Sequence, residues 1–390
     1  MRFFHLSDLH IGKHLHFYNL AEDQSYILEE IVKKAVTYRP DAIVIAGDIY
    51  DKSVPSGEAY QLFDSFLNML ADITPAIPVL IIAGNHDSAE RLQYASSFLE
   101  KHQIYIAVQP PMEEGEHLKK ITFQDAYGEV DFYLFPFTKP GYVRQLFGAG
   151  EVTDYESAYR LLLEREEIAY EEKRNVLVAH QFFVSEGKQP ETCDSELLSL
   201  NIGGLDGIDT RVISKFDYVA LGHIHGPQTL AGGKIRYAGT PLKYSVSEAG
   251  HNKSITMVTL TAKGEPPVIE TIPLEPMRDV RKLRGTMQEL MKADKTDDYV
   301  SIVLTDEKEP YRPKDTLEEV YGHILEITLD NQRTRQIQEQ LYASDGSMEK
   351  LPGPMEAFQE FYQLMNSQPM AAEESSLIAE ILEQLEEQQL

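Results

Sequence analysis

Residues 79–87 read Val-Leu-Ile-Ile-Ala-Gly-Asn-His-Asp, and this stretch constrains the fold more than any other part of the chain. Its apolar, mostly β-branched beginning is typical of a short strand that is buried on both faces. Gly84 then allows the backbone to turn sharply, and three polar side chains follow it at once. Because ligand sites of open α/β sheets lie at the carboxyl ends of the strands, the stretch predicts a polar site at this edge of a sheet.

Four other apolar runs end in polar residues of the same kinds. They cover residues 3–6, 41–46, 175–179 and 216–221. The side chains that the five strand ends would bring together are Asp8, His10, Asp48, Asn85, His86, His180, His223 and His225. One Asp-x-His or Gly-Asn-His-Asp segment is more often an ordinary polar turn. Five such blocks, in order after buried strands, predict a single site.

The patterns around these runs predict the fold class. Apolar residues recur at helical spacing over residues 22–38 and 56–70, and this β-α-β-α-β order predicts a parallel sheet covered by helices. We therefore predict an α/β protein that begins with a two-sheet αββα sandwich. The other elements expected there are helices over 88–101 and 153–172, a hairpin over 119–124 and 130–135, and strands at 104–108, 234–238, 254–260 and 268–272.

Two proline-containing segments, at residues 273–276 and 352–354, predict the domain organisation. The expected parts are a first domain at 1–273, a small α+β domain at 274–345, and a linker with C-terminal helices at 346–390. The small domain is expected to hold helices at 286–292 and 317–322 and strands at 299–304 and 325–329. The apolar positions of the two C-terminal amphipathic helices are Met355, Phe358, Tyr362, Met365, Leu377, Ile378, Ile381, Leu382 and Leu385.

The composition narrows the compartment and the partners. The single cysteine, Cys193, excludes an internal disulfide framework and suits a reducing cytoplasm, where we expect the protein. No run approaches the roughly 18 apolar residues of a membrane-spanning helix, so no membrane association is expected. The net charge of -27 disfavours nonspecific attraction to nucleic acid, and any proposal of a DNA substrate must accommodate it.

The donor atoms of the predicted site indicate its chemistry. They are carboxylate and amide oxygens and imidazole nitrogens, and none is a thiolate. Seven such side chains are enough for two divalent ions that share one carboxylate. Two ions about 3.5–4 Å apart can bridge a phosphoryl oxygen, lower the pKa of a bridging water and stabilise an in-line transition state. The mixed donor set suits Mn²⁺, Fe²⁺ or Zn²⁺ better than Mg²⁺.

As a set, the motifs Asp8-x-His10, Gly47-Asp48-x-x-Asp51, Gly84-Asn85-His86-Asp87, His180 and Gly222-His223-x-His225 resemble the calcineurin-like metallophosphoesterase superfamily. Within it, segments 4–12, 47–51, 221–225 and 237–241 are similar to a family of bacterial nucleases that act with an ATPase. The layout of a phosphoesterase domain, a small capping domain and helices that dock on the ATPase fits the same family. The resemblance covers nearly the whole chain, although the C-terminal part matches in pattern more than in motif.

The resemblance implies a role for each site residue. Asp8, His10, Asp48 and His225 would hold one ion, and Asp48, Asn85, His180 and His223 the other, with Mn²⁺ as the expected metal. His86 would be the catalytic histidine, and Asp51 would support it. The implied function is hydrolysis of DNA phosphodiesters in repair, recombination and replication. The substrates would be duplex ends, degraded with ATP, and single strands and hairpins. Two nuclease chains, paired through the nuclease domain, would join the ATPase in a heterotetramer.

Other functions remain open on the sequence alone. Protein phosphatases of the superfamily place an arginine after the second motif, whereas Asp51 is followed here by Lys52 and Ser53. Phosphodiesterases of small molecules share the metal-binding core but usually lack a separate small domain and terminal helices. A non-catalytic scaffold would not need all seven ligand types and His86. The net charge speaks against DNA unless the ATPase supplies the main DNA-binding surface.

Overall fold

The computed structural model describes residues 1–335 except 149, 186 and 197–206. Beyond them it describes positions 355, 358–359, 362, 370–371, 374–375 and 377–378. Two compact units can be distinguished. The first comprises Met1–Thr305 and Pro310–Thr328, and the second takes in Asp306–Glu309 and the chain from Leu329 onward. The predicted site lies in the first unit.

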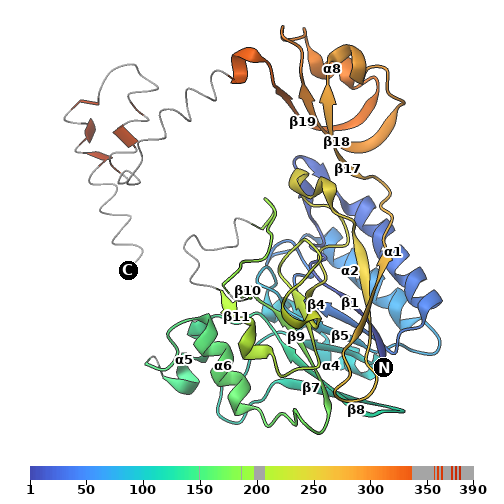
Figure 1. Cartoon of the computed structure of the whole chain (residues 1–390), viewed down its shortest axis with the longest axis vertical. Coiled ribbons are helices and arrows are strands. Elements are labelled where there is room, and N and C mark those ends of the chain that lie inside the picture. The colour runs from blue at the N-terminus through green and yellow to red at the C-terminus, as the bar shows by residue number, and fades with distance from the viewer. Residues whose placement is uncertain are drawn as a thin grey trace. The chain divides into compact units, whose positions relative to one another are not determined.

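The first sheet has six strands in the order β16-β15-β1-β4-β5-β6 (Figure 1). Its strands are β1 (Arg2–Leu6), β4 (Ala42–Ala46), β5 (Val79–Ile82), β6 (Ile104–Ala107), β15 (Ser254–Thr259) and β16 (Val268–Pro273). The four strands from β1 to β6 run parallel, while β15 is antiparallel to both of its neighbours. The parallel strands therefore present their carboxyl ends at one edge, as the sequence predicts.

The second sheet also has six strands, in the order β13-β14-β12-β9-β8-β7. They are β7 (Lys119–Asp125), β8 (Gly128–Phe135), β9 (Arg174–His180), β12 (Tyr218–Gly222), β13 (Gln228–Thr229) and β14 (Ile235–Tyr237). Strands β8, β9, β12 and β14 are parallel, and β7 and β8 form the predicted antiparallel hairpin. This sheet too has a parallel centre, and its carboxyl ends carry the remaining histidines.

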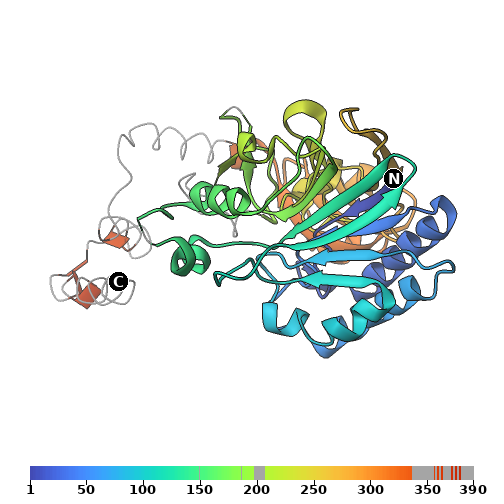
Figure 2. The same cartoon turned by 90° about the horizontal axis from the view of Figure 1, so that it is seen from below.

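The two sheets pack face to face around an apolar layer that includes Phe3, Val44, Leu80, Phe132 and Val176. Helices α1 (Ala21–Tyr38) and α2 (Gly57–Ala71) pack on the outer face of the first sheet, and α6 (Tyr155–Arg165) packs on the second. Figure 2 shows the helices on the two outer sides of the stacked sheets. These layers confirm the predicted αββα sandwich.

A three-stranded sheet follows the sandwich in the chain. It contains β17 (Val280–Gly285), β18 (Thr296–Leu304) and β19 (Tyr321–Leu329), with the short helices α7 (Met287–Leu290) and α8 (Pro313–Leu317). The remaining elements are β2 (His14–Leu15), β3 (Tyr18–Asn19), α3 (Ala89–Leu92), α4 (Ser96–Leu99), η1 (Glu100–His102), α5 (Pro140–Phe147), β10 (Phe183–Val184), β11 (Ile208–Asp209), η2 (Thr210–Ile213), η3 (Ala231–Gly233) and η4 (Val246–Gly250).

Three predicted helices differ from the structure. The helix expected over 88–101 is broken into α3, α4 and η1, because Ala95 adopts a left-handed conformation (φ 60°) that cannot continue a right-handed helix. The helix expected over 153–172 ends at Arg165, and the next residue, Glu166, is extended and accepts the backbone N–H of Leu118 at 2.9 Å. The helix expected over 317–322 was wrong in register, because it lies earlier, as α8, and β19 begins at Tyr321.

The predicted C-terminal helices lie mostly outside the described residues. Met355, Phe358, Tyr362, Leu377 and Ile378 are described, and each is helical. Met365, Ile381, Leu382 and Leu385 lie outside the described part of the chain. Among the residues that the structure does describe, no helix has the length and apolar character needed to cross a membrane.

Candidate metal centre

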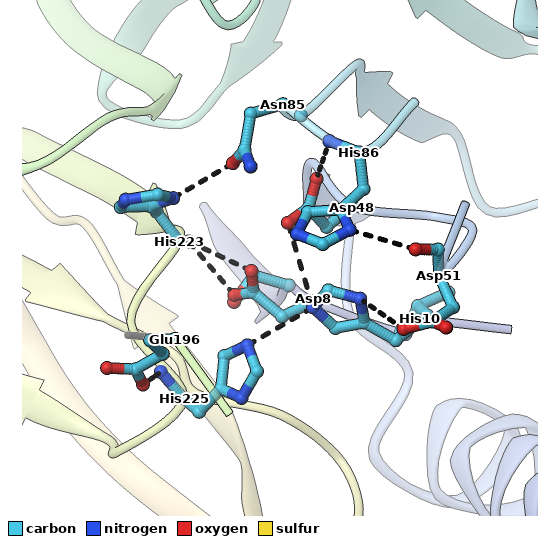
Figure 3. A network of polar contacts seen from close by, with 12 residues as sticks. Asp8, His10, Asp48, Asp51, Asn85, His86, Glu196, His223 and His225 are labelled. Atoms are coloured by element: carbon cyan, nitrogen blue, oxygen red, sulfur yellow. Dashed lines mark hydrogen bonds and ion pairs between the residues drawn. The ribbon is translucent and has the colours of Figure 1, made fainter. Parts of the chain in front are cut away.

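The carboxyl ends of five parallel strands converge on one cluster of polar side chains (Figure 3). Asp8 and His10 follow β1, Asp48 follows β4, Asn85 and His86 follow β5, His180 ends β9, and His223 and His225 follow β12. The carboxylates and imidazoles among the seven predicted ligands are all buried, and Asn85 and His86 are half-buried. The structure thus brings every predicted ligand to the same edge of the sandwich.

Backbone strain is concentrated at this edge. Asp8, His10, Asp48 and His223 have φ angles of 53°, 44°, 49° and 103°, in the left-handed region that residues other than glycine rarely adopt. Each such conformation costs about 1–3 kcal/mol and persists only where the surrounding structure imposes it. The positions that bear this cost are the ones whose side chains point into the cluster, which is the distribution expected of a functional site.

Glycines allow the strand ends to approach one another closely. A Cβ atom at Gly84 would collide with the carboxylate and backbone nitrogen of Asp48. A Cβ atom at Gly222 would collide with the carbonyl oxygen of Ala46. The turn after β5 is also held by Asp87, whose carboxylate accepts the backbone N–H groups of Gly84 at 2.9 Å and of Tyr50 at 3.0 Å. Asp87 thus orients the turn, as its helix-start position predicts.

Asp48 lies at the centre of the cluster. Its Oδ2 atom is 3.3 Å from Nε2 of His180 and 3.6 Å from Nε2 of His10. Its Oδ1 atom accepts the backbone N–H of His86 at 2.9 Å. One carboxylate therefore contacts histidines from both sheets.

The other donors are arranged around Asp48 in two groups. On one side, Nε2 of His10 and Nε2 of His225 are 3.1 Å apart, and both rings lie near Asp8. On the other side, Oδ1 of Asn85 is 3.0 Å from Nε2 of His180 and 2.9 Å from Nδ1 of His223. Groups whose ligand atoms all lie within 4.8 Å of one another are Asp8–His10–His225, Asp8–Asp48–His180 and His10–Asp48–His86.

Burial and neighbouring charges shift the pKa values in this cluster in opposite directions. Burial lowers the pKa of His10 well below its usual value, and burial together with His180 lowers the pKa of His223 to about 3. Burial opposes the charge on His180 as well, but the Asp48 and Asp8 carboxylates outweigh it and raise the pKa of His180 to about 9. Burial likewise opposes ionisation of Asp48, yet His180 holds the Asp48 pKa well below its usual value.

These residues fit divalent cations. His180 donates its Nδ1–H to the carbonyl of Ala46 at 2.8 Å, which leaves the Nε2 lone pair directed at Asp48 and Asn85. The facing Nε2 atoms of His10 and His225 would repel each other as two lone pairs unless a cation or a proton lies between them. Neutral imidazoles beside buried carboxylates form a donor set that binds first-row divalent metals.

His86 and Asp51 stand at the border of the cluster. His86 donates its Nδ1–H to the backbone carbonyl of Asp51 at 2.8 Å, and its ring lies edge-on to that of His10 with centroids 4.9 Å apart. The Asp51 carboxylate accepts Nζ of Lys13 at 2.7 Å and lies 3.6 Å from Nδ1 of His10. Asp51 therefore contacts His86 through its backbone and His10 through its side chain.

Sequence reasoning missed the residues that hold His225 from outside the cluster. They are Ser195, Glu196, Glu248 and Lys253, which contact the ring or the backbone of His225 or the groups that do so. None of them belongs to a strand-end motif. The only signal was the proximity of Glu248 and Lys253 in the sequence, and a Glu–Lys pair at that spacing is common on protein surfaces.

Comparison with known proteins agrees with this geometry. The family model for calcineurin-like phosphoesterases matches residues 1–227, and that for the Type 5 capsule protein repressor C-terminal domain matches residues 276–366. The SbcD subunit of the nuclease SbcCD from Staphylococcus epidermidis is 33% identical over 334 residues, which cover 84% of this chain and 85% of that protein. Its counterpart from Staphylococcus saprophyticus is 32% identical over 337 residues, which cover 84% of each chain.

A solved dimetal phosphatase from Danio rerio covers 71% of this chain and 98% of its own, with 14% identity and a TM-score of 0.39. That score is too low to bear on the assignment. The sequence matches, in contrast, cover the whole site and most of the chain. The chain therefore belongs to the calcineurin-like phosphoesterase family and, within it, to the SbcD family.

Proposed function

We propose that this chain is a two-metal-dependent phosphodiesterase that cuts DNA, the nuclease component of an SbcCD-type complex. One observation carries the proposal. Oδ2 of Asp48 lies 3.3 Å from Nε2 of His180 and 3.6 Å from Nε2 of His10, so a single carboxylate serves both halves of the cluster. A carboxylate in this place can be shared by two ions, and two ions with a shared ligand are suited to phosphoryl transfer.

The two groups of donors support the proposed ligand assignment. One ion would be held by Asp8, His10, Asp48 and His225, and the other by Asp48, Asn85, His180 and His223. The mixture of carboxylate, imidazole and amide donors supports Mn²⁺ as the metal. When bound, the two ions would activate a water molecule and neutralise charge on the phosphoryl group.

The protein's own residues supply the remaining catalysis. The backbone N–H of His86 is held by Asp48 and its Nδ1–H by the Asp51 carbonyl, so Nε2 is left for the substrate. A protonated His86 could deliver the Nε2 proton to the departing oxygen. Asp51, itself anchored by Lys13 at 2.7 Å, would position His86 rather than touch the substrate.

The substrate and the partner follow from the names of the staphylococcal relatives, which are SbcD components of the nuclease SbcCD. These names support DNA as the substrate, as duplex ends, single strands and hairpins, and an SbcC-type ATPase as the partner in DNA repair, recombination and replication in the cytoplasm. The net charge of -27 is consistent with a division of labour in which the ATPase provides most of the DNA-binding surface. The separate match at residues 276–366 supports a capping domain at 274–345.

A heterotetramer with two nuclease chains requires a surface on which two copies can pair. An apolar groove with a cavity of about 670 Å³ lies between α2 and the α3–α4 segment. Phe63 and Leu99 line it, and Tyr94 and Phe98 are 83% and 60% exposed beside it. Exposed aromatic side chains around an apolar groove are typical of a protein interface, which supports pairing of two copies through the nuclease domain.

Digestion of labelled DNA tests the proposed activity. The purified chain should cut single-stranded and hairpin DNA with Mn²⁺, lose this activity in a chelator and regain it when Mn²⁺ is restored. Addition of the ATPase and ATP should extend the activity to duplex ends. A phosphopeptide and a cyclic nucleotide serve as competing substrates under the same conditions. Faster turnover of either one than of DNA would contradict the proposed substrate class.

Truncation before Met355 tests docking on the ATPase. Met355, Phe358, Tyr362 and Met365 recur at helical spacing, which is typical of a helix that lies in a partner's groove. The truncated chain should keep its fold and its Mn²⁺-dependent cutting of single strands, but lose co-purification with the ATPase and ATP-stimulated degradation of duplex ends. Circular dichroism monitors the fold. Full affinity of the truncated chain for the ATPase would show that docking lies elsewhere.

A further inference from the structure

His225 is held from outside the cluster at three of its atoms. Its backbone N–H donates to the carboxylate of Glu196, and its carbonyl accepts Nζ of Lys253 at 3.0 Å. Its Nδ1 atom contacts the hydroxyl of Ser195 at 2.8 Å. The matching contact of His180 is simpler, because its Nδ1 rests on the backbone carbonyl of Ala46. The two histidines therefore have different support.

The hydroxyl of Ser195 determines where the proton of His225 resides. Ser195 donates its O–H to Oε1 of Glu248 at 2.8 Å. A hydroxyl has only one proton to donate, so Oγ of Ser195 must accept the Nδ1–H of His225. The imidazole is thereby held as the Nδ1–H tautomer. Its Nε2 lone pair then faces Nε2 of His10, 3.1 Å away, inside the cluster.

Glu248 supplies a full negative charge to this chain of hydrogen bonds. It is completely buried, and its Oε2 atom accepts Nζ of Lys253 at 2.6 Å. Its Oε1 atom lies 3.8 Å from Nδ1 of His225, which is too long for a direct hydrogen bond. Ser195 therefore bridges the carboxylate and the imidazole. A carboxylate behind a ligating histidine orients the ring and makes its free nitrogen a better donor.

We propose that Ser195 and Glu248 are positioning residues that fix the tautomer of His225 and strengthen the metal site formed with Asp8 and His10. This inference rests on the proposed ligand set. It also gives a role to the segment before residue 197, which carries no strand-end motif and is bound to the turn at Ser247 through the backbone N–H of Asp194, at 3.0 Å. Loss of the Ser195 hydroxyl should weaken one ion and leave the other unchanged.

Titration of the metal-free, full-length chain with Mn²⁺ tests this proposal, with free Mn²⁺ measured by electron paramagnetic resonance. Ser195→Ala should weaken one of the two binding steps by about 10–100-fold, the usual effect of losing such a supporting contact. Ser195→Thr should restore the affinity because it keeps the hydroxyl. Ser247→Ala is the matched control, because the Ser247 hydroxyl contacts Asp194 and Ser245 in the same region. It should leave both steps unchanged.

Two further measurements separate positioning from a general loss of structure. Nitrogen-15 NMR of the metal-free protein should show His225 as the Nδ1–H tautomer, and a mixture of tautomers in Ser195→Ala. Glu248→Gln should weaken the same binding step, and combining it with Ser195→Ala should add little, because both act through one chain of hydrogen bonds. Equal losses at both steps in Ser195→Ala, or unchanged affinity at both, would overturn the proposal. In either case a wild-type chain that binds two ions would leave the proposed function standing. A wild-type chain that binds fewer than two ions would overturn the proposed function, and this inference with it.

Discussion

Asp48→Ala is expected to abolish DNA hydrolysis and to lower the metal content by more than one ion per chain. The reason is that Asp48 contacts histidines of both groups, His180 at 3.3 Å and His10 at 3.6 Å. Removal of this carboxylate takes a ligand from each proposed ion. It also leaves His10 and His180 without the negative charge that faces them. The metal content after dialysis and the rate of DNA cutting measure the two effects.

Two further variants make this prediction sharp. Asp48→Asn keeps the shape of the side chain, and asparagine tolerates the left-handed backbone at this position (φ 49°) better than alanine does. It should also lose activity, which would separate the effect of charge from that of backbone strain. Asp64→Ala removes an exposed carboxylate on α2 and should change neither metal content nor rate. An Asp48→Ala chain that kept two ions and cut DNA would refute the ligand assignment.

The second large effect is expected for His86→Ala, which should keep both ions and lose about 10²–10⁴-fold in rate, the usual contribution of a positioned general acid. The basis is that Nδ1 of His86 is occupied by the Asp51 carbonyl at 2.8 Å, so its Nε2 is available to the substrate. Single-turnover rates of DNA cutting, together with metal content, measure the prediction. His102→Ala, at an exposed histidine of η1, is the control and should match the wild type.

The structure also defines the contrary outcome for His86. Ligand atoms of His10, Asp48 and His86 all lie within 4.8 Å of one another, a spacing that would also allow His86 to bind a metal. If His86→Ala lost an ion together with its activity, His86 would be a ligand. The metal content therefore distinguishes a catalytic acid from a ligand, which the rate alone cannot do.

Most of the fold could be predicted from local patterns. The apolar run at 79–82 became β5, the helical spacing over 22–38 became α1, and the serine at position 56 caps α2 by accepting the backbone N–H of Ala59. Such patterns succeed because a strand buried on both faces and a helix with one buried face each require their own periodicity. The ends of elements were less predictable. Glu166 leaves the helical conformation where it bonds Leu118, a residue far away in the sequence.

The sequence by itself determined which donors stand at the strand ends and in what order, because each follows its own strand and turn. Only the tertiary structure decided that Asp48 lies between His10 and His180, since that position depends on how two sheets pack. The same holds for the contact between Ser195 and Glu248, which are separated by 53 positions in the chain. Periodicity reports on neighbours within an element, whereas distances between side chains of different sheets are set by the packing of the core between them.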